Sequence, residues 1–175
     1  LELYNHFKNS LNSANEIHIF GNGGSAANAY HIVGDFTKTL ALYSQKLKIS
    51  SISDNGCYLS AASNDLDFSE VFSFLIPNRI SEKDSIIFLS GSGNSSNLVK
   101  CAYKAKKYGI KTIAITGFDG GKLKQIVDIP IHVPIHDMEI AEDTQLIIVH
   151  MIKQELCKYL AEKGFTPDCK VEKYN

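Results

Sequence analysis

The chain has 175 residues, of which 44% are hydrophobic and 21% are charged, and its formal net charge is -1 at pH 7. This composition is ordinary for a globular protein, and the near-zero charge argues against a nucleic-acid-binding or anionic-membrane-binding surface. At this length we expect a single domain with a substantial core, covering residues 1–175.

The four cysteines have no spacing typical of a metal site. They are Cys57, Cys101, Cys157 and Cys169. We expect them to be reduced and the protein to be cytoplasmic. The apolar runs fall far short of the ~20 residues that span a bilayer, so we expect neither a membrane span nor a signal peptide.

The first segment, residues 1–14, has the apolar spacing of one helical face, with Leu3, Phe7 and Leu11 among its members. We expect an N-terminal helix here. Because this pattern is already helical at Leu1, we also expect that upstream residues are missing from the sequence.

The next segment, residues 16–35, begins with an apolar run and breaks at the glycine-rich turn Gly21–Ser25. It then continues in a helical pattern, so the order is strand, glycine turn, helix. The free backbone N–H groups at the start of such a helix, together with the helix dipole, can hold an anion. A phosphorylated ligand is the natural guest of this turn.

The remaining strands and helices alternate along the chain. Strands are expected at 47–52, 84–89, 111–116 and 129–133. Helices are expected at 57–62, 68–75 and 95–108. A further short helix should end near Ile126, and a long one should run from His136 or Met138 to about Glu162. Residues 63–65 should interrupt the helical pattern, and a polar tail should occupy 164–175. Strands joined by helices favour a five-stranded parallel sheet in a three-layer α/β/α sandwich of flavodoxin-like type.

A second loop, residues 89–97, places Ser90, Ser92 and Ser95 beside the start of a helix. Three hydroxyl groups and the helix N–H groups suit phosphate oxygens. The alternative is a serine-rich surface turn in which Ser95 only caps the helix. Neither loop has the GxGxxG or GKS/GKT pattern, so a nucleotide cofactor is not expected.

His31 and Asp35 are four residues apart and share one face of the first long helix. His150 lies in an apolar stretch of the last helix, where a buried ring needs a polar partner. Glu142 precedes it by eight residues. These side chains could serve as general acid and base or as an N/O metal cluster, and the residues alone leave this choice open. A packed or solvated histidine is the simpler alternative for His31.

Four stretches together resemble the sugar isomerase (SIS) domain, and within it the phosphoheptose isomerases, which act on sedoheptulose 7-phosphate. They are Gly21–Ser25, Ser90–Ser95, Ile115–Lys122 and the last helix. The resemblance covers nearly the whole chain. It implies a cytoplasmic homotetramer with active sites between subunits and a phosphorylated sugar as substrate.

The resemblance also implies roles for individual residues. Asp35 would be the catalytic base and His150 its partner. The substrate would be bound by Asn22, Gly23, Ser25, Asp65, Ser90, Ser92, Ser95 and Glu142. Some members bind zinc, which here implies His31, Asp35, Glu142 and His150 as ligands.

Three positions depart from the family pattern. Asp35 stands where a glutamate is expected, Glu142 where a glutamine is expected, and Gly91 where a threonine contacts the substrate. Loss of one methylene at Asp35 shifts the carboxylate by more than ~1 Å, which affects catalysis. The added charge of Glu142 would strengthen divalent-metal binding.

The expected function is an aldose–ketose isomerase that converts sedoheptulose 7-phosphate to D-glycero-D-manno-heptose 7-phosphate for bacterial surface heptose synthesis, in lipopolysaccharide or capsule. One alternative is a non-catalytic SIS module that binds a sugar phosphate or a protein. Another is an isomerase of a different phosphosugar. The presence of both Asp35 and His150 favours the enzyme.

Overall fold

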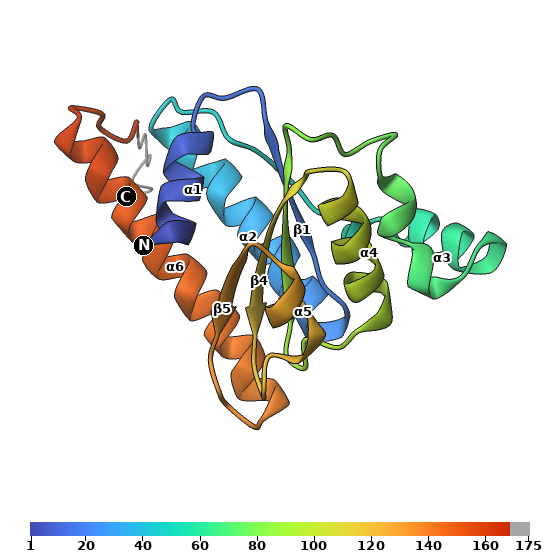
Figure 1. The fold of residues 1–175 in the computed structure, drawn as a ribbon. Helices are drawn as coiled ribbons and strands as arrows, with labels where there is room; N and C mark the ends of the chain where they lie inside the picture. Colours follow the sequence, from blue (N-terminus) through green and yellow to red (C-terminus); the bar gives the residue numbers. More distant parts are fainter. Residues whose placement is uncertain (169–175) are drawn as a thin grey trace, which may run out of the picture.

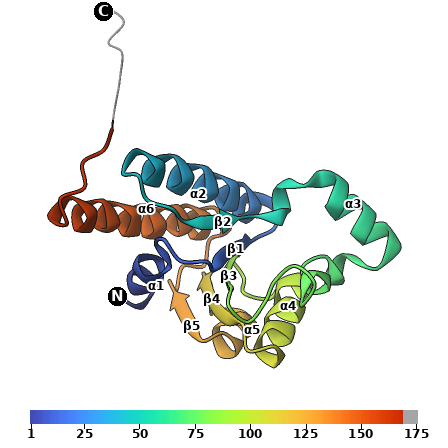
Figure 2. The ribbon, with the colours of Figure 1, turned by 90° about the horizontal axis from the view of Figure 1, so that it is seen from above.

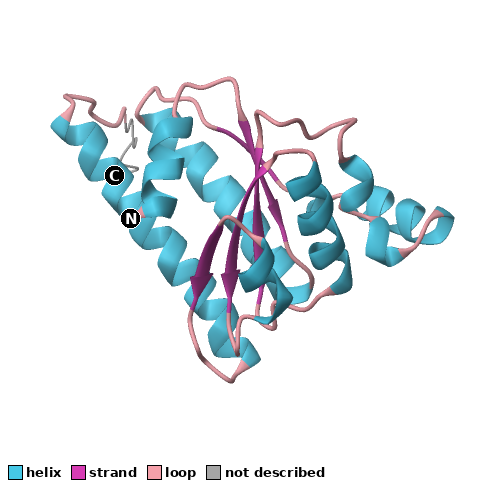
Figure 3. Cartoon of the chain, viewed as in Figure 1, coloured by secondary structure: helices cyan, strands magenta, loops and turns pink. Residues whose placement is uncertain are grey.

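The computed structural model describes residues 1–168 and contains a five-stranded sheet flanked by helices (Figures 1 and 3). The strands are β1 (Glu16–Phe20), β2 (Lys48–Ser50), β3 (Ser85–Ser90), β4 (Lys111–Thr116) and β5 (Ile129–His132). Their order is β2-β1-β3-β4-β5, and every neighbouring pair is parallel. The predicted five-stranded parallel sheet is confirmed.

The helices form a layer on each face of the sheet (Figure 2). They are α1 (Glu2–Ser10), α2 (Gly23–Leu42), α3 (Gly56–Asp65), α4 (Ser96–Lys107), α5 (Gly121–Ile126) and α6 (Met138–Glu162). Helices α1, α2 and α6 pack on one face, whereas α4 and α5 pack on the other, with α3 at its outer end. The expected three-layer α/β/α sandwich is therefore confirmed.

The central strand β3 explains how one apolar run supports both layers. Ile86 and Phe88 point into the core under α4, while Ile87 and Leu89 point into the core under α2 and α6. Successive side chains of a strand face opposite sides, so a strand covered on both faces reads as a continuous apolar run.

Strands β1 and β3 lie side by side, and Phe20 is paired with Phe88. The loops that follow these two strands therefore leave the sheet next to each other. The chain winds outward in opposite directions from this pair, to β2 on one side and to β4 on the other. Ligands of open parallel sheets bind at this kind of switch point, outside the carboxyl ends of the strands.

Two local predictions were wrong. The expected helix at 68–75 consists of two short 3₁₀ turns, Phe68–Glu70 and Ser73–Leu75. The Asp67 side chain accepts from the Ser69 N–H at 2.7 Å, and the Ser73 hydroxyl bonds to Glu70, so side chains compete here with regular helix bonds. Conversely, residues 63–65 continue α3 as its last turn, where the Ser63 hydroxyl donates to the Leu59 carbonyl at 2.6 Å.

Near the ends of the chain, α1 is shorter than the expected 1–14, whereas α6 ends at Glu162 as expected. Cys57, Cys101 and Cys157 are free thiols, and burial raises the pKa of Cys101. Cys169 and most of the expected 164–175 tail lie outside the described residues. None of the helices in the described part of the chain combines the length and apolar character needed to cross a bilayer.

Candidate functional site

The two predicted anion loops meet at the carboxyl ends of β1 and β3 and enclose a small pocket of about 220 Å³. Both loops contribute to its walls, and α6 closes it from one side. The lining residues are Asn22, Gly23, Ser25, Leu89, Ser90, Gly91, Ser92, Ser95, Met138 and Glu142. All the predicted substrate-binding residues except Asp65 therefore come together in one place.

The loop at residues 89–97, called the serine loop below, leaves its hydroxyl protons available for a ligand. Ser90 Oγ accepts from the Gly93 N–H at 3.1 Å, and Ser92 Oγ accepts from the Asn94 N–H at 3.2 Å. A hydroxyl that accepts can still donate its own proton. Ser95 occupies the N-cap position of α4, but its side chain makes no capping hydrogen bond. The helix-cap alternative for Ser95 therefore lacks its defining contact.

Gly93 fixes the shape of this loop. Its φ is +66°, and a Cβ there would lie 2.1 Å from the Gly120 carbonyl oxygen. Only glycine accommodates both the left-handed backbone and the close approach of the Gly120 loop. The Gly93 carbonyl also accepts from the Leu123 N–H at 3.0 Å, so the start of α5 supports the serine loop.

Asn22 and Asn97 join the two loops through a pair of amide hydrogen bonds. Each side-chain Nδ2 donates to the other Oδ1 at 2.9 Å. One N–H of Asn22 is left for a ligand, because a primary amide has two donors. Asn97 is 1% exposed, and sequence reasoning missed it. The sequence showed Asn97 only as a polar residue in the first turn of α4, on the face that turns toward the core.

Glu142 lies against the N-terminus of α2. Its Oε1 accepts from the Ser25 N–H at 3.0 Å and lies 3.5 Å from Ser25 Oγ. A Cβ on Gly24 would come within 2.0 Å of Glu142 Oε2, so the carboxylate fits only because this position is glycine. The chain thus places its own anion on one of the two helix starts, where the dipole favours negative charge.

Gln145 is a second buried residue of α6 that sequence reasoning missed. Its Nε2 donates to Ser25 Oγ at 3.1 Å, and its Oε1 accepts from Asn28 Nδ2 at 3.0 Å. Asn28 Nδ2 also donates to the Glu142 carbonyl at 2.8 Å. These contacts tie α6 to α2 and leave the Ser25 hydroxyl proton directed away from Gln145, because the oxygen is the acceptor.

The predicted acid–base residues form a separate group farther along α2 and α6. His31 Nε2 lies 3.0 Å from His150 Nε2, and His150 Nε2 lies 3.6 Å from Asp35 Oδ2. His31 and Asp35 share a face of α2 as expected, and His150 meets them because α2 packs against α6. Lys153, one turn after His150, forms an ion pair with Asp35. No feature of the sequence marked Lys153.

The donor types in this group suit zinc. One atom from each of His31, Asp35 and His150 lies within 4.8 Å of the other two. Imidazole nitrogens and a carboxylate oxygen are common zinc ligands. Glu142, the fourth predicted ligand, is outside this group, because its carboxylate is held at the start of α2. The Asp35 carboxylate is paired with the Lys153 ammonium group.

Asp65, the remaining residue predicted to bind the substrate, lies at the end of α3 and away from the pocket walls. It is exposed in the last turn of α3, where its Oδ1 accepts from Asn64 Nδ2 at 2.9 Å. It is not among the residues that line the pocket. The structure therefore does not bring Asp65 to the other predicted residues within one chain.

Comparisons with known proteins agree with this architecture. Residues 2–117 match the SIS domain family. The chain is 33% identical over 155 residues to a phosphoheptose isomerase of Helicobacter pylori (strain P12), covering 89% of this chain and 81% of that protein. A phosphoheptose isomerase of Geotalea daltonii is 31% identical over 156 residues, covering 89% and 79%.

Among solved structures, phosphoheptose isomerase GmhA from Neisseria gonorrhoeae superposes with a TM-score of 0.78 at 27% identity. The superposition covers 86% of this chain and 81% of that chain. The similarity thus extends over most of the chain. The chain belongs to the SIS-domain family of phosphoheptose isomerases.

Proposed function

We propose that this protein is an aldose–ketose isomerase that converts sedoheptulose 7-phosphate to D-glycero-D-manno-heptose 7-phosphate. The observation that carries the proposal is the arrangement on α2 and α6. An anion pocket lies at one end of the helix pair, and a carboxylate with two histidines lies farther along. Membership of the phosphoheptose isomerase family gives the substrate class.

The spacing between the two groups suits an open-chain sugar phosphate. Six residues separate Ser25 from His31, or about 9 Å of helix, and eight separate Glu142 from His150, or about 12 Å. This is comparable to the distance from the phosphate to the carbonyl end of an extended heptose. A substrate held by its phosphate would therefore present C1 and C2 near His31 and His150, and the Asp35 carboxylate adjoins that position because its Oδ2 lies 3.6 Å from His150 Nε2.

In the binding step, Ser25, Ser90, Ser92 and Ser95 would donate hydroxyl hydrogen bonds to the phosphate. The remaining N–H of Asn22 and the backbone at Gly23 would contact the sugar. Hydroxyl donors hold a phosphate at the start of α4 without burying a lysine, and the helix dipole adds to the attraction. Glu142 at the pocket wall would accept from a sugar hydroxyl, and Asp65 would contribute from a neighbouring subunit.

In the chemical step, Asp35 would remove a proton from C1 of the ketose and give an enediol. His150 would move the proton between the O1 and O2 oxygens, and the C1 proton would return at C2 to complete the aldose. The reaction only redistributes protons within the substrate, so it needs no oxidant or reductant. Positioned acids and bases of this type contribute typically 10²–10⁴-fold each.

For a metal, we propose that His31, Asp35 and His150 would hold a zinc ion once the Lys153 ammonium group has left Asp35. A bound zinc ion would supply Lewis-acid stabilisation of negative charge on the enediol oxygens. The proton transfers described above belong to side chains of the protein.

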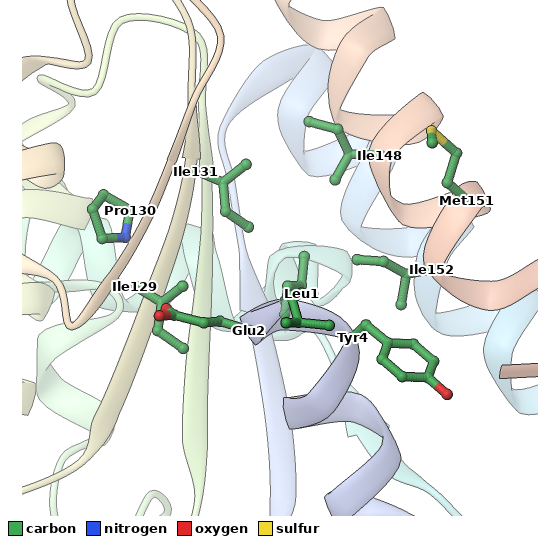
Figure 4. A pocket seen from close by; sticks show the side chains of 10 residues that line it. Leu1, Glu2, Tyr4, Ile129, Pro130, Ile131, Ile148, Met151 and Ile152 are labelled. Atoms are coloured by element: carbon green, nitrogen blue, oxygen red, sulfur yellow. The ribbon is translucent and has the colours of Figure 1, made fainter. Parts of the chain in front are cut away.

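We further propose that the enzyme works as a cytoplasmic homotetramer in bacterial surface heptose synthesis, for lipopolysaccharide or capsule. A hollow of about 410 Å³ lies between α1, β5 and α6, and its walls are mostly apolar, with Glu2 as the charged member (Figure 4). Ile131 and Ile152 point toward this space. Contact between copies at such a surface would bury apolar area, which favours association.

The direct test is an aldose-formation assay with sedoheptulose 7-phosphate, run with a chelator and again with zinc. The same reaction in D₂O should incorporate deuterium at C2 of the aldose, because the proton that Asp35 takes from C1 can exchange with solvent before it is delivered to C2. The reduced sugar, a heptitol 7-phosphate, is the matched ligand: it should inhibit competitively without turnover. Binding of both compounds with no aldose and no deuterium exchange would refute the enzyme and favour a binding module.

A further inference from the structure

Lys153 has an environment unlike that of an ordinary surface lysine. Its side chain is 21% exposed, and that of its partner Asp35 is 16% exposed. Five residues farther along α6, Lys158 forms an ion pair with Glu155, and those side chains are 67% and 57% exposed. Water screens the second pair strongly, whereas the first is sheltered between two packed helices. The Lys153–Asp35 ion pair is therefore a sheltered, structural part of the site.

The Lys153 ammonium group and the His150 ring both lie beside the same oxygen of Asp35. Lys153 Nζ pairs with Asp35 Oδ2, and His150 Nε2 lies 3.6 Å from that same atom. Lys153 follows His150 by three residues, so both side chains leave the same face of α6. A positive charge thus already stands at the carboxylate oxygen that faces His31 and His150.

A divalent ion bound to His31, Asp35 and His150 would need this oxygen or its neighbour on the same carboxylate. Two positive charges at this distance repel, and the repulsion is stronger where side chains are partly buried than in bulk water. The lysine must leave Asp35 before the metal can bind with full affinity. The residue therefore opposes metal binding even though the three donor types suit zinc.

We propose that Lys153 is a built-in cation that takes the place of a divalent metal at Asp35. It is a positioning residue: it holds the short Asp35 side chain toward His150, and it keeps the affinity of the His31, Asp35 and His150 group for divalent metal low. Removing the ammonium group should therefore raise the affinity of these three residues for a divalent metal. The part of this proposal that concerns turnover rests on the proposed isomerase function, whereas the part that concerns metal affinity does not.

The test measures metal binding to the purified full chain by titration with Co²⁺, whose visible absorption reports coordination by imidazole and carboxylate. Lys153→Met keeps the length of the side chain and removes the charge, and Lys153→Arg keeps the charge. Lys158→Met is the matched control, because it removes an exposed lysine from the same helix. A double variant, Lys153→Met with His31→Ala, reports whether the metal binds at the predicted group.

We expect Lys153→Met to bind Co²⁺ roughly tenfold or more tightly than the wild type, with a new absorption band. Lys153→Arg and Lys158→Met should behave like the wild type, and the double variant should lose the gain. Equal affinity of the wild type and Lys153→Met would overturn the proposal. A gain that persists in the double variant would overturn it too. If Lys153→Met does not fold, Lys153→Gln is used with the same expectation.

A kinetic measurement in the presence of chelator tests the positioning role. Lys153→Met should lower kcat by roughly tenfold or more, because a misplaced base costs rate, and should leave KM within about twofold, because the phosphate pocket is elsewhere. Lys153→Arg should retain most of the wild-type kcat. Unchanged kcat in Lys153→Met would refute the positioning role. Absence of activity in the wild type would refute the isomerase and leave the metal titration to decide the rest.

Discussion

The pocket proposed to hold the phosphate and the acid–base group both involve α2 and α6, but the pocket adds the loop before α4, and the two are built from different chemical groups. The pocket uses neutral hydroxyls and backbone N–H groups, and short loops fix their positions. The acid–base group uses long side chains from α2 and α6, and charge and imidazole contacts hold them in place. A pocket of the first kind suits an anion through fixed neutral donors, whereas the proposed proton transfer of the second kind depends on how long side chains are positioned.

This difference separates binding from turnover and can be tested by substitution. Changes in the acid–base group should act mainly on kcat, since those side chains are proposed to act on the reacting carbons. Changes in the serine loop should act mainly on KM, since the loop is proposed to hold the phosphate. A mutation that moved both parameters equally at either place would show that the two regions do not work independently.

The largest effect is expected for Asp35→Asn, which keeps the shape of the side chain and removes the base. We expect kcat to fall by about 10²–10⁴-fold with KM changed by less than about threefold. Steady-state kinetics with sedoheptulose 7-phosphate would measure it, and circular dichroism would check the fold. Glu155→Gln is the control, because it removes a carboxylate from the exposed face of α6. Full activity in Asp35→Asn would remove Asp35 from the mechanism.

The next prediction concerns Ser95 and distinguishes a role in phosphate binding from a role as a helix cap. Since the Ser95 hydroxyl makes no capping bond, Ser95→Ala should change the unfolding free energy by less than about 0.5 kcal/mol. The same change should raise KM roughly tenfold, because a hydrogen bond to a charged phosphate contributes about 1.5–3 kcal/mol. Ser96→Ala is the neighbouring control. A stability loss of about 1 kcal/mol with unchanged KM would restore the capping explanation.

Sequence reasoning predicted the parts of this molecule that local pattern determines. Ile86–Leu89 reads as a buried strand because both faces are covered, and the serine loop, which is predicted from its own residues to hold an anion, lines a pocket. The bounds of α6 follow from its periodicity and from Asp137, whose side chain accepts from the Ile140 N–H at 3.0 Å. These features need no knowledge of which elements become neighbours.

The unpredicted residues depend on contacts between elements that are distant in sequence. Asn97 matters because α4 starts beside the β1 loop, and Gln145 matters because α6 crosses the start of α2. Lys153 reads as an ordinary helical lysine until α6 is packed on α2. A polar side chain of this kind gives no local signal, since its partner is more than seventy positions away in each case.

A smaller effect separates the pH dependence of the fold from that of the site. Burial lowers the pKa of His18, whose Nε2 is buried without a partner, and burial lowers the pKa of His6, whose Nε2 bonds to Ser85 Oγ at 2.9 Å. Both histidines bind a proton more readily in the unfolded chain. Their neutral forms therefore stabilise the fold above the unfolded pKa of about 6.5, and that stability is lost as the pH falls.

We expect the unfolding free energy to drop between pH 7.5 and pH 5, by at most about 2 kcal/mol for each of these histidines. Urea unfolding at the two pH values would measure the drop. His18→Asn should reduce its size even if the variant is less stable at both values. An unchanged difference between the two pH values would show that His18 does not contribute.

The smallest effect is a gain, and it tests whether the pocket is purely an anion site. Glu142 places a negative charge at the wall of a pocket that is proposed to hold a phosphate. Glu142→Gln removes the charge, and its side-chain oxygen can still accept from the Ser25 N–H. We expect inorganic phosphate, followed by calorimetry, to bind about threefold to tenfold more tightly at low salt, with a smaller gain at high salt because ions screen the repulsion. Asp143→Asn removes the same charge from the adjacent exposed position of α6 and should change little. Weaker phosphate binding by Glu142→Gln at low salt would mean that the carboxylate shapes the pocket more than it repels the ligand, and the two regions would then differ in geometry rather than in charge.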